Sequence, residues 1–226
     1  MKHTHAVAAL SAVAIACGGN SPATSHNNPG TGSSTLKVTG DIDGSISSGN
    51  PLTSFTVTVK DGAGNNVSGA TVVVLNPSLS NGGLPLVEAT PASGRYTNSV
   101  AQFPSGDFEL SVTHPSGNVQ GVVVGGPGMH TINAPTVNST MPANQPLAVS
   151  WTTPTQAKQA TVWTRDLNAV SAPDTGAFTI AATQNPPNAN QRVFVERFNE
   201  VDAAGGLAGS RLRVTFTASV DPFVVQ

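Results

Sequence analysis

The chain's one cysteine is the residue whose position says most about chemistry. Cys17 directly follows a run of apolar and small residues, Ala6 to Ala16, and a polar, glycine-rich stretch begins at Gly18. Crossing a bilayer takes about 20 apolar residues, so this shorter run is typical of a signal peptide instead. A single cysteine can form no disulfide within the chain. Its thiol therefore points to modification or anchoring.

The segment Ala14-Ile15-Ala16-Cys17 resembles the lipobox of bacterial lipoproteins. The resemblance implies that residues 1–16 are removed as a signal peptide and that Cys17 becomes a lipidated N-terminus carrying diacylglycerol and palmitate. It departs from the family at Ala14, where leucine is usual, and the alternative is an ordinary secretory signal cleaved nearby. The implied partner is a membrane, reached through the lipid anchor. The implied location is the cell envelope: the outer membrane, facing the periplasm or the outside.

Histidines and carboxylates are too few and too scattered to predict an active site. A hydrolase needs a nucleophile, a base and an orienting group together. Ser116 and Asp107 are near His114 in sequence, but neither His114 nor His130 lies in a Gly-x-Ser-x-Gly context. We therefore predict turn or surface histidines, no catalytic residue and no enzyme.

One acidic pair is a weak metal candidate. Asp41 and Asp43, in the segment from Gly40 to Gly44, resemble the start of a calcium loop, but no acidic ligand follows between Ser45 and Thr53. The alternative is a turn that leads into a strand. We expect no metal and no cofactor.

Two tryptophans differ in the face on which a strand would place them. Trp151 shares parity with Leu147 and Val149, which predicts a core position. Trp163 alternates with apolar residues, so a strand would place it on the face opposite to theirs. Trp163 and Arg165 are therefore the candidate recognition contact, suited to a protein or glycan partner. The alternative register turns Trp163 inward.

Composition restricts the fold and the partners. Charged residues make up 10% of the 226, glycine (23) and proline (17) are abundant, and the formal net charge is -2. Nucleic-acid binding needs a basic surface, so we expect no nucleic-acid partner. Such a mixture is typical of strands and turns.

Alternating apolar residues predict the elements that position these side chains. Phe55, Val57 and Val59 predict one strand, and the residues from Ala70 to Val74 predict a second, joined to it as a hairpin. Phe108, Leu110 and Val112 predict another inward set. Later alternations run over 147–151, 161–165, 176–182, 192–198 and 211–218. No helical stripe lasts three turns after Cys17, so the fold class is all-β.

Two sets of residues resemble known sandwich modules. Asp61-Gly62, Gly94-Arg95-Tyr96 and Gly106-Asp107-Phe108 resemble the Ig-like carboxypeptidase-regulatory or transthyretin-like modules, while the segments 147–151 and 174–180 resemble fibronectin-III or Ig-like surface modules. The resemblance implies two Ig-like β-sandwich domains in tandem. The predicted ranges are signal peptide 1–16, lipidated cysteine and flexible tether 17–35, first sandwich 36–133, linker 134–144 and second sandwich 145–226.

The sequence favours a non-catalytic cell-envelope lipoprotein that presents β-sandwich modules for adhesion, binding or spacing. One alternative is an accessory subunit of an envelope assembly for secretion, pilus formation or polysaccharide export. The other is a carbohydrate-binding accessory to an enzyme.

Overall fold

The computed structural model describes residues 26–47 and 49–226, so the signal peptide 1–16 and Cys17 lie outside the described residues. The described part is built from strands and two 3-10 turns, which confirms the all-β prediction. The elements are β1 (Thr31–Gly32), β2 (Leu36–Ser47), β3 (Asn50–Asp61), β4 (Thr71–Leu75), η1 (Ser80–Gly82), β5 (Gly83–Glu88), β6 (Arg95–Val100), β7 (Asp107–His114), β8 (Gly117–Gly125), β9 (Ile132–Ala134), β10 (Thr140–Met141), β11 (Leu147–Trp151), β12 (Gln159–Thr164), β13 (Val170–Ala172), β14 (Ala177–Ile180), η2 (Ala182–Gln184), β15 (Asn188–Asp202) and β16 (Arg211–Val225).

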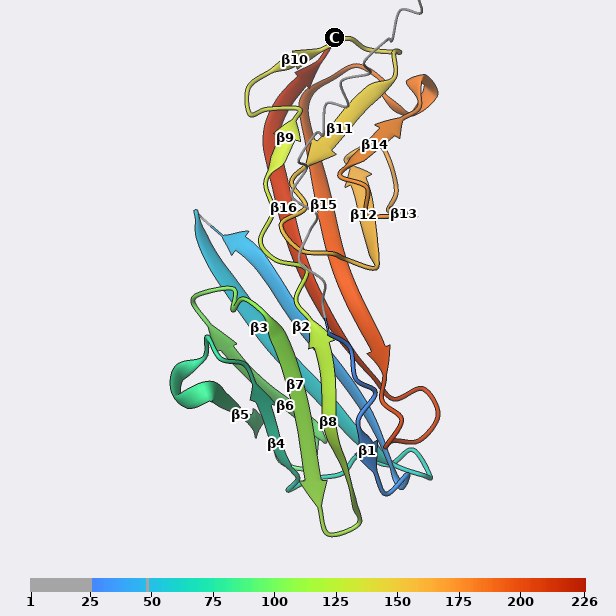
Figure 1. Ribbon diagram of the computed structural model, residues 1–226. Helices are drawn as coiled ribbons and strands as arrows, with labels where there is room; N and C mark the ends of the chain where they lie inside the picture. The colour runs from blue at the N-terminus through green and yellow to red at the C-terminus, as the bar shows by residue number, and fades with distance from the viewer. Residues whose placement is uncertain (1–25, 48) are drawn as a thin grey trace, which may run out of the picture.

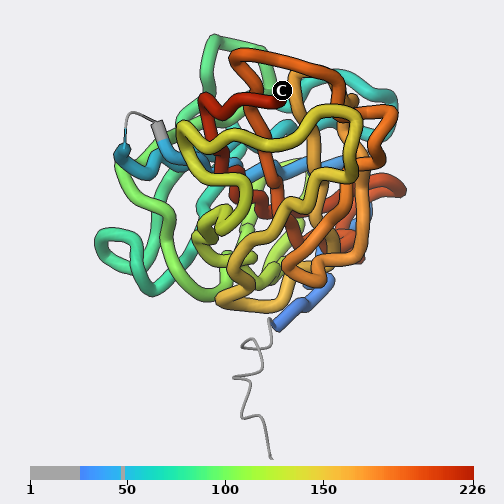
Figure 2. Tube along the Cα trace, turned by 90° about the horizontal axis from the view of Figure 1, so that it is seen from above, coloured from blue at the N-terminus to red at the C-terminus, as the bar shows by residue number. Residues whose placement is uncertain are grey.

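The strands form two lobes, each with two layers around its own core (Figure 1). In the first lobe, the layer β1-β8-β7-β4-β5 packs against the layer β6-β3-β2-β16, and β5 pairs with both β4 and β6. In the second lobe, the sheet β14-β11-β9 covers the strands β16-β15-β12-β13. Seen from above, the second lobe lies over the first (Figure 2).

A long hairpin, β15 and β16, runs through both lobes. Each strand has 15 residues, or about 50 Å at ~3.4 Å per residue, which exceeds the usual strand length of 3–10 residues. Val193, Val195 and Phe223 belong to the second core, while Leu212 and Phe216 belong to the first. Residues 145–226 therefore supply strands to both cores. The prediction had placed a linker at 134–144 and assigned 145–226 to the second sandwich alone.

The first core follows from strand alternation. Phe108, Leu110 and Val112 are fully buried, as predicted, because every second side chain of a strand points to the same face. The rings of Phe55 and Phe108, from opposite layers, lie 6.4 Å apart at a tilt of 54°, a favourable aromatic geometry. Apolar contact between the layers is what holds this lobe together.

The predicted hairpin between the strands of Phe55–Val59 and Ala70–Val74 is wrong. β3 pairs with β2 and β6, whereas β4 pairs with β5 and β7, so the two strands lie in opposite layers. Tyr96 fixes the crossing: its hydroxyl accepts a hydrogen bond from the Ala70 amide at 2.9 Å and donates one to the Val67 carbonyl at 2.8 Å. The local turn at Asp61 is real, but turn residues do not specify which strands pair.

Two segments predicted as connectors are paired. The tether was predicted over 17–35, but its described residues follow the edge of β8, with a β-bridge between Asn28 and Val123 and β1 antiparallel to β8. Within the predicted linker 134–144, β10 pairs with β16 in parallel. An edge strand leaves backbone N–H and C=O groups open, and an adjacent polar segment can satisfy them.

No helix in the described part of the chain is long and apolar enough to cross a membrane.

Candidate functional site

The outer face of β15 carries the side chains of the candidate site. Val193 and Val195 point into the second core, so Phe194 and Glu196, between and after them, point to the opposite face. The same alternation on β12 buries Ala160 and Val162 and places Trp163 outward, half-buried. The register with Trp163 outward is therefore correct, and so is the core position of Trp151.

Trp163 and Phe194 form a stacked aromatic pair. They are direct cross-strand partners on β12 and β15, their ring centroids are 5.1 Å apart and their planes differ by 8°. The guanidinium of Arg192 lies 5.0 Å from the centroid of the Phe194 ring. Such cross-strand and cation–π contacts hold the rings in place while leaving them half-exposed. A fixed aromatic surface of this kind suits recognition.

A hollow of about 390 Å³ lies beside this pair, and we call it the trough. It crosses from β12 and β15 over β16 to β2 and β3, which are neighbours in the sheet. Trp163 and Phe194 line one side and Leu52 the other, with small and polar residues between them. The lining residues are Asp43, Gly44, Ser45, Leu52, Ser54, Trp163, Phe194, Glu196, Thr215 and Thr217.

A second hollow, of about 330 Å³, also borders Trp163. Thr161, Leu167 and Asn168 contribute to its lining, and Trp163 and Glu196 line both hollows. Each volume is at the lower end of the ~300–1,000 Å³ range of small-molecule sites. The two hollows together offer a surface that crosses several strands.

Carboxylates dominate the electrostatics of the trough. Burial raises the pKa of Glu196, while Arg213, whose Nη2 donates to Glu196 Oε1 at 2.7 Å, acts in the opposite direction and Asp43 adds to the rise. Asp43 Oδ1 accepts a hydrogen bond from the Thr215 hydroxyl at 2.8 Å. Arg213 also stacks on Phe198, with its guanidinium carbon 3.8 Å from the ring centroid. Carboxylate oxygens are acceptors only, so the trough favours ligands that donate hydrogen bonds.

The structure separates the other predicted site residues from the trough. Arg165 does not line either hollow and lies 3.8 Å from Asp221 as an ion pair. Asp41 accepts a hydrogen bond from Arg211 at 2.8 Å. Asp41 and Asp43 are both inside β2, not in a calcium loop or an entry turn. Among residues 26–47 and 49–226, no three histidine, cysteine or acidic residues gather as metal ligands would.

The two candidate histidines lie apart. His114 and Ser116 share a hydrogen bond of 2.7 Å in the exposed turn between β7 and β8. Asp107 is at the other end of β7, near His26. His130 is buried beside Phe216, and its Nε2 donates to the Val195 carbonyl at 3.1 Å. Burial, followed by the charge of Arg197, lowers the pKa of His130 to about 4. Its position is that of a core residue.

The inner face of β15 carries a buried polar cluster. Arg197 is fully buried and its Nε donates to Asp174 at 2.9 Å, while Trp151 Nε1 donates to the other carboxylate oxygen at 2.9 Å. Arg197 also donates to the carbonyls of Pro127 and Thr155. Buried charges are tolerated when their hydrogen bonds are made, and these bonds tie the loops between the lobes to β15. This cluster is structural.

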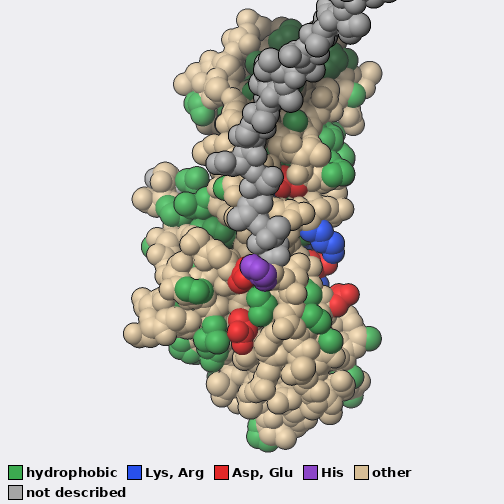
Figure 3. Space-filling view, in the orientation of Figure 1, with side chains coloured by type: hydrophobic (Ala, Val, Ile, Leu, Met, Phe, Trp, Pro, Cys, Tyr) green, Lys and Arg blue, Asp and Glu red, His purple; other side chains and the backbone are tan. Residues whose placement is uncertain are grey.

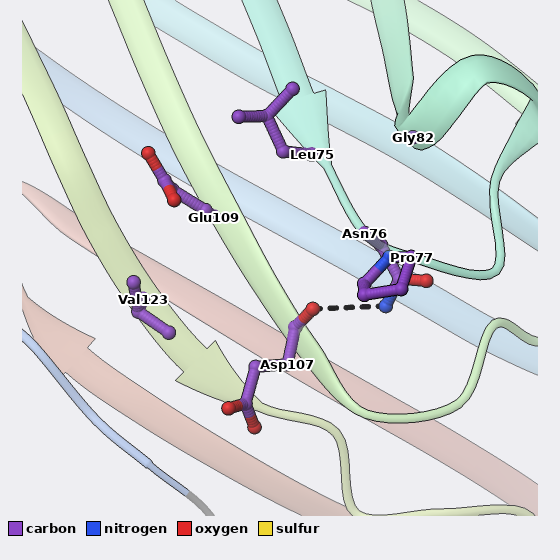
Figure 4. A pocket seen from close by; sticks show the side chains of 7 residues that line it. All are labelled: Leu75, Asn76, Pro77, Gly82, Asp107, Glu109 and Val123. Atoms are coloured by element: carbon purple, nitrogen blue, oxygen red, sulfur yellow. Dashed lines mark hydrogen bonds between the residues drawn. The ribbon is translucent and has the colours of Figure 1, made fainter.

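Another hollow lies in the first lobe and offers less chemistry. It has a volume of about 450 Å³ and is lined by β4, β7 and β8 (Figure 4). Its Asn76 side chain donates to the backbone carbonyl of Asp107 at 2.9 Å, so it fixes the loop. Its lining contains no aromatic residue. The face seen in Figure 3 has few charged side chains and scattered hydrophobic ones.

The comparisons with known proteins give no family. No family model matches the chain and no curated protein matches it. Among solved structures, fibronectin(III)-like modules of Clostridium thermocellum CbhA match at 14% identity and a TM-score of 0.26, over 80% of this chain and 92% of theirs. The Yersinia pseudotuberculosis adhesin InvE matches at 16% identity and a TM-score of 0.28, over 81% of this chain and 60% of its own. TM-scores this low add no argument about function.

Proposed function

We propose that the chain is a non-catalytic protein of the cell envelope, held by a lipid on Cys17, that uses the outer face of its sheet as a recognition surface. The proposed recognition role is supported by the stacked pair of Trp163 and Phe194 beside the trough. Aromatic residues on a fixed surface are the usual anchors of recognition. The resemblance at Ala14 to Cys17 carries the anchoring part.

The path of the N-terminal segment supports this arrangement. β1 pairs with β8, in the layer opposite to β2 and β3, so the chain enters the fold on the side away from the trough. Between Cys17 and His26 the chain can span at most about 30 Å, at ~3.3–3.6 Å per residue. A membrane anchor at Cys17 therefore leaves the outer face of the sheet accessible.

The distribution of polar groups supports a non-catalytic role. In the described part of the chain, neither His114 nor His130 contacts a carboxylate, and one carboxylate oxygen of Glu196 is hydrogen-bonded to Arg213. A binding surface needs only shape and hydrogen-bonding groups, and the trough supplies both.

Membrane fractionation with protease shaving of intact cells tests the proposal. The native protein is expected in the membrane fraction and the Cys17→Ser variant in the soluble fraction. Shaving of the native protein from outside would place the recognition surface on the cell exterior, and resistance would place it in the periplasm. Equal solubility of both proteins would overturn the anchor.

A further inference from the structure

The trough is built for one class of ligand. We propose that it binds a neutral carbohydrate chain, through stacking on Trp163, which Phe194 supports from behind, and hydrogen bonds to Asp43 and Glu196. This inference rests on the proposed recognition surface, but not on the lipid anchor, and names its ligand class.

The aromatic pair matches the apolar side of a sugar ring. A pyranose ring presents a patch of C–H bonds on one face, and the negative π-face of an aromatic ring attracts such weakly positive hydrogens. Trp163 and Phe194 are half-buried and locked by their mutual stacking, so little side-chain freedom is lost on binding. Arg192 braces Phe194 at 5.0 Å.

The rest of the trough matches the polar edge of a sugar. Its middle is lined by hydroxyl-bearing residues, among them Ser45 and Thr217, which can both donate and accept hydrogen bonds, and Thr215, whose hydroxyl donates to Asp43 and can still accept. Asp43 and Glu196 each accept a hydrogen bond from the protein through one carboxylate oxygen. The second oxygen of each can accept one from a sugar hydroxyl. Sugar hydroxyls are donors, so the two sets of groups are complementary.

The charges of the trough favour a neutral glycan over an anionic one. Of the residues that the structure describes along the trough, two, Asp43 and Glu196, are acidic and none is basic. The neighbouring guanidinium of Arg213 is already bonded to Glu196 and stacked on Phe198. An anionic polysaccharide would meet like charges in the trough, and like charges at short range are unfavourable. The trough therefore disfavours an acidic glycan, and its hydroxyl-bearing lining suits an uncharged one.

The second hollow indicates a chain rather than a single sugar. Trp163 and Glu196 lie between the two hollows, of about 390 and 330 Å³. An oligosaccharide that crosses the strands could contact Trp163 and occupy both hollows. A protein partner fits less well, since specific interfaces bury about 800 Å² on each side and, among the described residues, the exposed large apolar side chains near the trough are those of Ile46 and Leu52.

Affinity electrophoresis of the purified full-length chain carrying Cys17→Ser tests this inference. The protein is run through gels that contain galactomannan, hydroxyethylcellulose or polygalacturonate. We expect at least one of the two neutral polysaccharides to retard the protein in proportion to its concentration, and the acidic one to have no effect. Absence of retardation by both neutral polymers, or retardation by polygalacturonate alone, would overturn the inference.

Point variants locate the site. We expect Trp163→Ala to weaken the association constant by about tenfold or more, the loss typical of an aromatic anchor. Trp163→Phe should keep much of the binding, and Asp43→Asn should weaken it by several-fold. Asp41→Asn is the matched control, because Asp41 lies on the same strand and face as Asp43 but does not line the trough. Its binding should equal that of the unsubstituted protein.

Equal retardation of the unsubstituted protein and both the Trp163→Ala and Asp43→Asn variants would also overturn the inference. Failure of glycan binding with intact Cys17-dependent membrane association would refute the ligand class and leave the envelope anchor standing. Glycan binding without membrane association would refute the envelope anchor and leave the ligand class standing.

Discussion

The two faces of β15 carry similar residues in opposite circumstances. On the inner face, Arg197 is fully buried with Asp174, and Trp151 donates to the same carboxylate. On the outer face, Arg213 pairs with Glu196 beside the half-exposed Trp163. The inner groups are bonded to loop backbone and to one another, whereas the outer groups border two hollows. Burial and hydrogen-bond saturation, and not residue type, therefore distinguish a structural role from a recognition role.

Removing one inner charge should have the largest effect on stability. Arg197→Met leaves the carboxylate of Asp174 buried without its cation, and breaking a buried pair in this way costs about 3–5 kcal/mol. Urea unfolding followed by far-ultraviolet circular dichroism measures the loss. Arg213→Met is the matched control on the outer face, where an ion pair contributes about 0–1 kcal/mol. Similar losses for the two variants would break the comparison.

Substitution of the two tryptophans should likewise lower the free energy of unfolding by different amounts. Trp151→Ala empties a core position and removes the hydrogen bond to Asp174, so we expect a loss of about 3–5 kcal/mol. Trp163→Ala removes an aromatic pair, which contributes about 0.5–1.5 kcal/mol, and only part of a buried surface, so its loss should be smaller than that of Trp151→Ala. Thermal unfolding of the two variants checks this order. A larger loss for Trp163→Ala would mean that the outer pair is structural.

Acid should weaken the inner cluster through His130. Its pKa is about 4 in the folded protein and ~6.5 when unfolded, so the unfolded chain binds more protons between these values. Stability is therefore retained above pH 6.5 and falls as the pH drops toward 4, by about 2 kcal/mol at pH 5 from this residue. Arg197 faces the imidazole unfavourably and Asp174 favourably, and burial outweighs both.

Unfolding of the native protein and His130→Gln at pH 7 and pH 5 isolates this contribution. The variant should lose less stability on acidification than the native protein. Groups such as Glu196, whose raised pKa acts in the opposite direction, cancel in the comparison. Equal acid sensitivity would show that His130 does not titrate as a buried group.

The outer ion pair should matter least for stability. Glu196→Gln removes the charge opposite Arg213 but keeps the shape of the side chain, and partly exposed pairs contribute about 0–1 kcal/mol. The same substitution should weaken glycan retardation, because an amide accepts hydrogen bonds through only one oxygen. Comparing urea midpoints with affinity electrophoresis separates these two effects. A stability loss above about 2 kcal/mol would contradict the comparison.

Much of this arrangement was predictable from local alternation. The parity of Leu147, Val149 and Trp151 predicted a buried tryptophan, and the parity around Val162 offered an outward Trp163. Phe194 and Glu196 were missed as site residues. Their signal was present in the segment Arg192 to Phe198, where two phenylalanines share the parity of charged residues instead of that of the valines.

Long-range pairing was not predictable in this way. The first lobe is completed by β16, which pairs in parallel with β2, and the two strands are far apart in the sequence. Such pairing depends on how whole layers bury their apolar faces, so it cannot be predicted from the alternation within one strand. The same limit explains the wrong hairpin between β3 and β4 and the tether residues that pair with β8. The trough is lined by residues of five strands, so it could not be predicted before the neighbours of these strands were known.

Tryptophan fluorescence tests the contrast between the two faces most directly, because the chain has only two tryptophans. Trp151→Phe leaves Trp163 as the reporter of the outer face, and Trp163→Phe leaves Trp151 as the reporter of the inner face. We predict that acrylamide quenches Trp163 much more than Trp151, and that the neutral polysaccharide which retards the protein shields Trp163 alone. Equal quenching of both, or shielding of Trp151 instead, would contradict the assignment of recognition to the outer face.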